Sequence, residues 1–325
     1  MSPVGTPRLA APATRGVVLI VIASLFFGVS GPLAKGLINA GLTPVEATWL
    51  RIAGTAVLMG IAAIGPLRVA RRLPWWELVA FGLAAVAGVQ VFYFVAVSRL
   101  PVGIALLLEF TGPILVVAWI ALVRRTRLPK SAVIGSLVSL AGLAIVVQVW
   151  TGVRLDTLGL VAGAAAAACQ AGYFLVGERL TGKVDTRVML AVGFGVAAVA
   201  LLPLARPWSL DWAVLTESAS LGGWSTSAGV LAAMLIGATA LAYAAGIPAL
   251  RLLSAPVAGA MAYLEVVVAT VVAWLALSET LSTAQVVGGV VVLVGVYLAQ
   301  RSVTAPKAVA PVVDDDHSVV SGAVG

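Results

Sequence analysis

Long apolar runs dominate the chain, and short polar or basic segments separate them. A helix needs about 20 mostly apolar residues to cross the hydrocarbon core of a bilayer. The pattern therefore predicts an all-α integral membrane protein. Its ten transmembrane helices are expected at approximately 16–38, 45–65, 75–98, 101–123, 131–150, 157–180, 186–204, 228–248, 255–277 and 283–300.

Lysine and arginine are distributed unevenly between the two sides of these predicted spans. If the N-terminus is inside, fifteen of the 20 basic residues fall in inner segments and four in outer ones, while Arg51 lies within the second span. The positive-inside rule then places both termini in the cytoplasm. We expect a multi-pass protein of the cell (plasma or inner) membrane.

Composition narrows the chemistry that is available. With 61% hydrophobic and 10% charged residues, the chain is not an ordinary water-soluble globule. One cysteine and one histidine leave no disulfide framework and no Cys/His metal cluster, so neither a metal nor another cofactor is expected. The sequence has no P-loop for ATP. The net charge of +7 comes from short basic clusters that suit an anionic membrane leaflet better than nucleic acid.

The chain divides into two similar halves. A shift of 153 residues places Gly135 on Gly288 and Gly142 on Gly295. Five spans per half is an odd number, so the second half must enter the membrane from the opposite side and form a 5+5 inverted repeat, as alternating-access transporters do. We expect a cytoplasmic arm at 1–15, one five-helix repeat at 16–150, a second at 157–300, and a disordered cytoplasmic tail at 301–325.

Several motifs resemble one transporter family. They are Pro44-x6-Arg51 in the second span, TALAY at 239–243 and LSETLSTAQVVGGVVVLVGVYL at 277–298. The two halves are similar to the paired EamA-type domains of the drug/metabolite transporter superfamily. The stretch PVGIALLLEFTGP at 101–113 resembles, more narrowly, the fourth span of threonine/homoserine exporters. The resemblance implies a ten-helix transporter; where the family often has Glu-Pro in the ninth span, this chain has Glu265-Val266.

Glu109 lies about eight residues inside the fourth predicted span. A charge at that depth costs at least about 2.5–3.5 kcal/mol unless a partner, water or a proton compensates it. Pro113 has no N–H to donate to the carbonyl of Glu109, so this residue exposes both its side chain and its backbone. Such a break is tolerated where it lines a watered cavity or is buried in protein. The run Thr111-Gly112-Pro113 thus favours a cavity-facing site, with a structural glutamate as the alternative.

Two further charged residues lie at membrane depth. Glu265 is near the middle of the ninth span, the repeat partner of the fourth, and either joins the same site or packs between helices. Arg51 has a depth similar to that of Glu109. Because buried charges usually have partners, we predict that Arg51 pairs with Glu109 or holds a carboxylate of the solute; the alternative is that it snorkels outward.

Three pairs of polar side chains each share one helical face, at a spacing of three or four residues. These pairs are Gln90 with Tyr93, Gln170 with Tyr173, and Thr239 with Tyr243. They are candidates either for lining a polar solute site or for hydrogen bonds between helices.

Other polar and proline positions predict local structure. Pro32 should break the first span and act as a hinge or a site wall. The run T-P-V-E, from Thr43 to Glu46, has the form of a helix start with a capping threonine and a reciprocal glutamate. Ser282 and Gln285 repeat that spacing before the last span.

Together these features predict a secondary transporter that exports a small metabolite such as an amino acid, with proton exchange at Glu109. A broad exporter of drugs or aromatic compounds and a metabolite importer of the same fold are the alternatives. An intramembrane enzyme is disfavoured because the spans offer no histidine, cysteine pair or metal-ligand set. A receptor would leave the inverted repeat unexplained. The expected partners are a small solute, protons and lipid, and the chain is compatible with a monomer or a homodimer.

Overall fold

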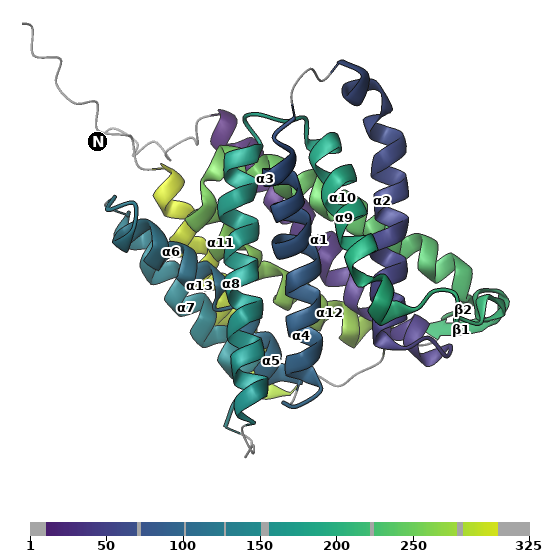
Figure 1. Cartoon of the computed structure of the whole chain (residues 1–325). Helices are drawn as coiled ribbons and strands as arrows, with labels where there is room; N and C mark the ends of the chain where they lie inside the picture. The colour runs from purple at the N-terminus through teal and green to yellow at the C-terminus, as the bar shows by residue number, and fades with distance from the viewer. Residues whose placement is uncertain are drawn as a thin grey trace, which may run out of the picture.

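The computed structural model describes residues 11–69, 73–100, 102–126, 128–150, 156–221, 224–277 and 282–304. Within these ranges the chain forms a helix bundle (Figure 1). The helices are α1 (Ala11–Asn39), α2 (Pro44–Val69), α3 (Trp75–Ala80), α4 (Val89–Val97), α5 (Val102–Glu109), α6 (Gly112–Leu122), α7 (Lys130–Val146), α8 (Thr157–Leu180), α9 (Thr186–Ala205), α10 (Ala228–Leu253), α11 (Ala255–Ala262), α12 (Leu264–Leu277) and α13 (Thr283–Thr304). A π-helical segment, Phe81–Gly88, joins α3 to α4.

Among the described residues, seven helical segments are long and apolar enough to cross a membrane by themselves, and three shorter apolar helices accompany them. The shorter ones are 130–146, 255–269 and 283–299. Most of the expected tail, residues 305–325, and the first ten residues of the expected arm lie outside the described residues, whereas α13 continues to Thr304, beyond the predicted end of its span.

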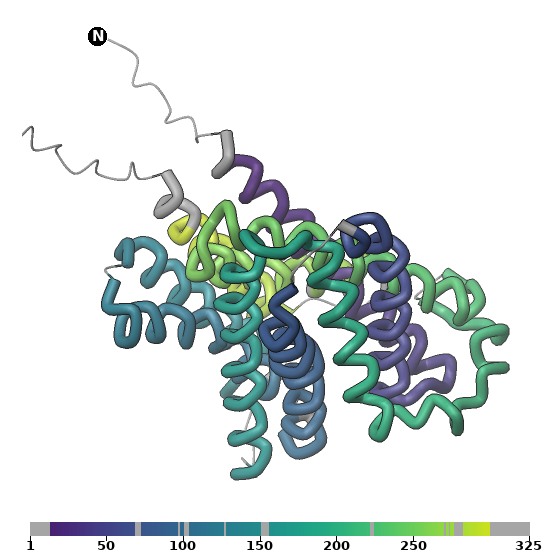
Figure 2. Tube along the Cα trace, turned by 45° about the horizontal axis from the view of Figure 1, so that its top comes forward, coloured from purple at the N-terminus to yellow at the C-terminus, as the bar shows by residue number. Residues whose placement is uncertain are grey.

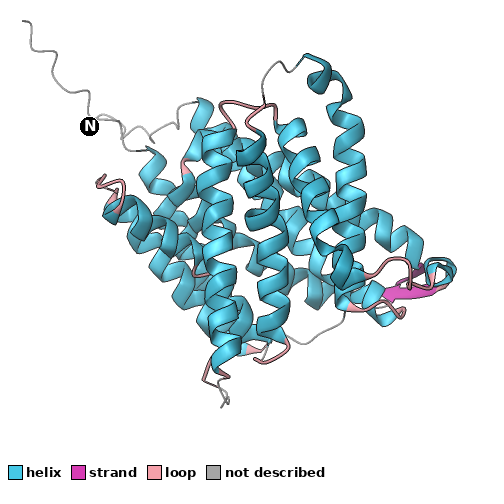
Figure 3. Ribbon diagram, viewed as in Figure 1, coloured by secondary structure: helices cyan, strands magenta, loops and turns pink. Residues whose placement is uncertain are grey.

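One segment of the described chain, between α9 and α10, is not part of the helix bundle. Between α9 and α10, a short 3-10 turn (Trp212–Thr216) leads into strands β1 (Ser218–Leu221) and β2 (Trp224–Ser227), which pair antiparallel (Figure 3). The prediction of an all-α chain missed this hairpin because four-residue strands leave no recognisable period in the sequence.

The two ends of the bundle differ in what they contain. At the terminal end α1 begins and α13 finishes, as Figures 1 and 2 show. At the hairpin end, β1 contacts the last turns of α1, where Gly36 lies against Leu221. Both predicted helix starts lie next to loops and are confirmed as reciprocal caps: Glu46 N–H donates to Thr43 Oγ1 at 3.2 Å, and Gln285 N–H donates to Ser282 Oγ at the same distance.

The prediction that Pro32 breaks the first span is wrong, because α1 continues through it to Asn39. A proline removes one helical hydrogen bond, and membrane helices tolerate this when nearby hydroxyls bond to backbone carbonyls. Pro32 removes the donor to the carbonyl of Gly28, and one residue earlier the hydroxyl of Ser30 donates to the carbonyl of Phe27 at 2.6 Å.

The fourth and ninth predicted spans are interrupted at matching places. The fourth is divided at Phe110 and Thr111, between α5 and α6, and the ninth at Tyr263, between α11 and α12. A shift of 153 residues, the separation between Phe110 and Tyr263, also places the first residues of α3, α5 and α7 on those of α10, α11 and α13. Local structure therefore follows the same register as the sequence.

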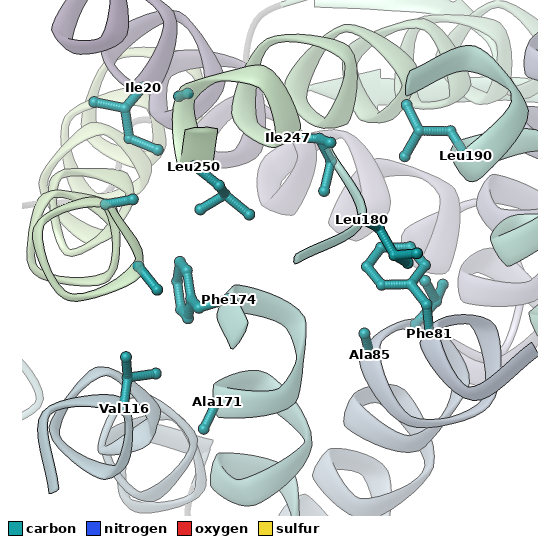
Figure 4. Close-up of a cluster of buried hydrophobic side chains, with 14 of the residues drawn as sticks. Ile20, Phe81, Ala85, Val116, Ala171, Phe174, Leu180, Leu190, Ile247 and Leu250 are labelled. Atoms are coloured by element: carbon teal, nitrogen blue, oxygen red, sulfur yellow. The ribbon is translucent and has the colours of Figure 1, made fainter. Parts of the chain in front are cut away.

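Apolar clusters pack the bundle at both ends. The largest apolar cluster includes fully buried Leu78, Leu180 and Leu250, which lie at the terminal end where α3 begins and α8 and α10 finish. Figure 4 shows Leu180 and Leu250 among other side chains of this cluster. Toward the hairpin end, the described residues form two smaller and separate clusters. One joins α1 to α10 through residues such as Leu37 and Leu231, and the other joins α4, α5 and α8. The largest cluster also reaches the hairpin end, at Val146 of α7 and Leu201 of α9, so apolar packing runs the length of the bundle and the two smaller clusters flank it.

Candidate functional site

A cavity of about 230 Å³ lies within the bundle, lined from α1, α2, α4, α5, α8, α10 and α12 together with adjoining segments. Eight of the predicted site residues line it: Arg51, Gln90, Tyr93, Glu109, Gln170, Tyr173, Tyr243 and Glu265. They come from helices far apart in sequence, so the fold brings together most of the polar side chains that the apolar spans contain.

Both carboxyl groups lie beside interrupted helices. Glu109 is the last residue of α5, and Glu265 is the second residue of α12. The amide of Gln170 donates through Nε2 to Oε1 of Glu109 at 3.4 Å. Ending a helix at this depth lets a carboxyl group project into a cavity instead of lying along a continuous helical surface.

Arg51 supplies the positive charge of the cavity. It interacts electrostatically with Glu109 and with Glu265. Its Nε has no hydrogen-bond partner in the part of the chain that the structure describes. Arg51 lines the cavity, and the predicted pairing with Glu109 is not formed as an ion pair between the described residues. The site therefore combines one guanidinium with two carboxyl groups.

The predicted pairs on α4 and α8 both reach the cavity, and an aromatic cluster forms one wall. The ring of Tyr243 meets Phe27 at a centroid distance of 5.0 Å, Phe194 at 4.7 Å and Tyr173 at 5.7 Å, in each case edge to face. This geometry is the favoured one for aromatic rings. The cluster holds the two tyrosines in place.

Two predicted hydroxyls are not part of the cavity lining. Thr111 donates through Oγ1 to the carbonyl of Leu108 at 2.6 Å, and Thr239 donates to the carbonyl of Leu235 at 2.8 Å. Thr239 bonds within α10, and Thr111 bonds from the interruption back to the last turn of α5, so both hydroxyls are used by nearby backbone.

The residues of the predicted helix break have packing roles. A Cβ built on Gly112 would lie 2.5 Å from Oε1 of Gln170, so this glycine leaves the room that the amide occupies. Pro113 packs against Gly259 of α11, where a Cβ would lie 3.0 Å from the proline Cβ. The interruption thus places α6 close to α8 and α11. Pro32 does not line the cavity.

The contribution of α1 to the cavity lining was not predicted from the sequence. Ser24, Phe27 and Ser30 line the cavity. Their spacing of three residues puts them on one helical face. Two serines three turns or less apart in an apolar span are a signal that could have identified this face from the sequence.

Ion pairs lie at both ends of the bundle: Arg99 and Asp156 are 3.6 Å apart where α4 finishes and α8 begins, and a larger group lies at the terminal end. The buried carboxylate of Glu77 accepts from Nζ of Lys183 at 3.1 Å and lies 3.3 Å from Arg179. Glu178 lies 3.5 Å from Arg124 and accepts from the backbone N–H of Ala255 at 3.4 Å. These contacts connect α3, α6, α8, α11 and the loop after α8.

Comparisons with known proteins identify relatives along most of the chain. Residues 14–148 and residues 157–300 each match the EamA-like transporter family. The threonine/homoserine exporter RhtA of Salmonella typhimurium (strain SL1344) is 30% identical over 274 residues, covering 83% of this chain and 85% of that protein. The uncharacterized transporter YwfM of Bacillus subtilis is 28% identical over 209 residues, covering 62% of this chain and 68% of that protein. One crystal structure, 22% identical, shares the fold with a TM-score of 0.69 over 90% of this chain and 99% of its own.

Proposed function

Because the chain belongs to the EamA-like transporter family, we propose that it is a secondary transporter that exports a small amino acid of the threonine or homoserine kind. The observation that carries this proposal is the cavity in which Arg51 faces two carboxyl groups, Glu109 and Glu265, inside an otherwise apolar bundle. Charged groups at membrane depth generally mark a solute or ion pathway. The threonine/homoserine exporter named above supports the choice of solute.

In this proposal the chain crosses the membrane ten times as a 5+5 inverted repeat, with repeats at 16–150 and 157–300. The matched helix starts and the matched interruptions at Phe110 and Tyr263 support the repeat. An odd number of crossings per repeat reverses the second copy in the membrane. The cavity then lies between the copies, where alternating-access transporters bind their solutes.

The terminal end faces the cytoplasm in this proposal, with both termini inside the plasma membrane or inner membrane. The excess of lysine and arginine on that side supports the orientation. Continuous apolar packing and the ion pairs of Glu77 and Glu178 close the cytoplasmic side.

Export is coupled to protons through Glu109. When the cavity opens outward, Glu109 takes up a proton as the solute leaves, and in the inward state it returns the proton to the cytoplasm. A buried carboxyl group beside a helix interruption is chemically suited to this exchange, because it has a hydrogen-bond donor in Gln170 and an opposing charge in Arg51.

The first test is flux of threonine and homoserine in proteoliposomes with an imposed pH gradient. Wild type is compared with Glu109→Gln, and Glu46→Gln is the matched control because Glu46 only caps α2. We expect Glu109→Gln to lose gradient-driven flux and to retain solute counterflow. Flux of neither amino acid in folded wild type would refute the amino-acid assignment, and a pH-sensitive Glu109→Gln variant would refute the coupling role.

One observation favours a second candidate, a broad exporter of aromatic or cationic compounds. Phe27, Tyr173 and Tyr243 present an aromatic wall next to two carboxyl groups, a combination that binds organic cations. Overexpression would then protect cells against toxic cations of unrelated structure. Protection limited to amino acids and their analogues would favour the first candidate.

A further inference from the structure

The guanidinium of Arg51 is unusual among the charged groups of the described chain. Arg51 takes part in none of the ion pairs between described residues, and its buried Nε has no hydrogen-bond partner there. It nevertheless lines the cavity. A buried donor without an acceptor is costly, so a ligand that brings an acceptor to this point gains binding free energy.

The carboxyl groups of the cavity do not take that place. Glu109 and Glu265 act on Arg51 electrostatically, but Glu109 bonds to Gln170, and neither glutamate forms an ion pair with Arg51 in the described structure. The guanidinium thus lies near two carboxyl groups of the protein, and its N–H donors stay available to a carboxylate of a bound ligand.

The chemistry that fits this arrangement is a small molecule with one carboxylate and one ammonium. A planar guanidinium binds a carboxylate through two parallel N–H···O bonds, which no other group in the cavity offers to an anion. The two carboxyl groups attract the ammonium. An α-amino acid carries both charges on neighbouring carbons and is small enough for a cavity of about 230 Å³.

Resting on the function proposed above, we propose that Arg51 is the residue that makes the cavity select α-amino acids over amines of the same skeleton. Without Arg51, the charged groups among the cavity-lining residues are the two carboxyl groups, which repel a carboxylate and attract a cation. Loss of Arg51 therefore does more than weaken binding. It shifts the preference of the site from zwitterions to amines.

The test compares threonine with threoninol, the amino alcohol in which the carboxylate is replaced by a hydroxymethyl group. Each unlabelled compound competes against labelled threonine for uptake into proteoliposomes, and the ratio of their half-inhibitory concentrations measures selectivity. Wild type should prefer threonine by about tenfold or more, the worth of a charge-assisted bidentate contact. In Arg51→Gln the apparent affinity for threonine should fall at least about tenfold, while that for threoninol stays the same or rises.

Two further variants keep the result interpretable. Arg51→Lys retains the charge and should keep the order of preference, with a smaller ratio because an ammonium lacks the planar fork. Arg187→Gln is the control, since Arg187 pairs with Asp185 outside the cavity. If Arg51→Gln takes up too little label, thermal shifts of the purified protein with each compound give the same ratio.

The outcomes separate this inference from the proposed function. Threonine transport in wild type together with an unchanged threonine-to-threoninol ratio in Arg51→Gln overturns the role of Arg51 and leaves the transporter in place. Absence of amino-acid transport in wild type overturns the proposed function. An inverted ratio in Arg51→Gln, with the wild-type order kept in Arg51→Lys, supports both.

Discussion

The hydroxyl of Tyr263 donates a hydrogen bond to the backbone carbonyl of Phe110, and the two residues are separated by the repeat distance of 153. A contact between positions matched by the 153-residue shift is the one expected if the proposed repeats are related by a local two-fold axis. Ser139 donates to the carbonyl of Val292 at 3.5 Å, and that pair also differs by 153. Both contacts therefore follow the same 153-residue register and support the proposed repeat. One lies where α5–α6 crosses α11–α12, and the other where α7 crosses α13.

Replacing Tyr263 with phenylalanine tests this contact. The helix interruption directs the N–H of Ile114 to the carbonyl of Thr111 at 2.9 Å, so the Phe110 carbonyl depends on the tyrosine hydroxyl. Tyr263→Phe should lower the free energy of unfolding by about 1–3 kcal/mol, the cost of a buried acceptor without a donor. Reversible unfolding in detergent micelles measures it.

Tyr263→Leu provides the comparison. It loses the hydroxyl and also the ring contact with Phe110, whose centroid lies 5.6 Å away. The leucine variant should be less stable than the phenylalanine variant. Equal stability of Tyr263→Phe and wild type would mean that the carbonyl finds another donor and that the contact contributes no net stability.

The sequence predicted most of the fold because membrane helices follow directly from length and hydropathy. It also located Glu109 and Arg51 at matching depths, and both line the cavity. What it could not predict was the use of each hydroxyl. Thr111 and Thr239 resemble site residues by type and spacing. Each hydroxyl instead donates to a backbone carbonyl three or four residues earlier, and hydrophobic periodicity does not predict such a bond.

Pro32 and the hairpin of β1 and β2 show the other limit. Proline reads as a breaker in any sequence, whereas its effect inside a bundle depends on the donors around it, which come from tertiary packing. The hairpin of β1 and β2 is held partly by the contact of Leu221 with α1, a partner remote in the sequence. Such contacts carry no local signature.

The crossing of α7 and α13 depends on glycine at close approach. A Cβ on Gly142 would lie 2.6 Å from the backbone nitrogen of Val292 and 2.9 Å from the carbonyl oxygen of Gly288. Backbone atoms cannot move aside as a flexible side chain can. Gly142→Ala should therefore destabilise the protein by about 1–3 kcal/mol through overpacking.

The control lies on the opposite face of α13. A Cβ on Gly289 would meet no atom within 4 Å, so Gly289→Ala should leave stability unchanged or raise it slightly. Thermal unfolding of the two variants in the same detergent gives the comparison. Equal melting temperatures would show that the helices separate without cost and that this crossing is not tightly packed.

The buried carboxylate of Glu77 predicts an asymmetry between two ways of breaking its ion pairs. Lys183 and Arg179 keep 46% and 59% of their side chains exposed, whereas Glu77 keeps 8%. Glu77→Gln leaves two cations in contact with water and should cost about 1 kcal/mol or less. The double variant Arg179→Ala, Lys183→Ala leaves a buried charge without a partner and should cost about 3 kcal/mol.

Unfolding measured at neutral pH for both variants decides this point. Greater destabilisation by Glu77→Gln than by the double variant would contradict this prediction. It would mean that the charge of Glu77 does not depend on the two cations for its stability in the folded protein.

Gly112 links the helix interruption to the chemistry of the cavity. A Cβ at this position would lie 2.5 Å from Oε1 of Gln170 and 3.0 Å from the carbonyl oxygen of Ala167, so Gly112→Ala must displace the amide. The hydrogen bond from Gln170 to Glu109 would then be lost. Because a displacement of about 1 Å at a functional site costs up to about a hundredfold in rate, we expect the initial threonine flux to fall ten- to hundredfold.

Gly172→Ala is the matched control, since Gly172 lies on the same helix as Gln170 and a Cβ there would meet no atom within 4 Å. Gln170→Leu should reproduce the loss of flux without changing the backbone. If Gly112→Ala transports like wild type while Gln170→Leu does not, the amide has kept its place and the glycine is needed for neither packing nor transport. If both variants transport normally, the hydrogen bond to Glu109 is not part of the transport mechanism, and the positioning of this carboxyl group must come from α5 itself.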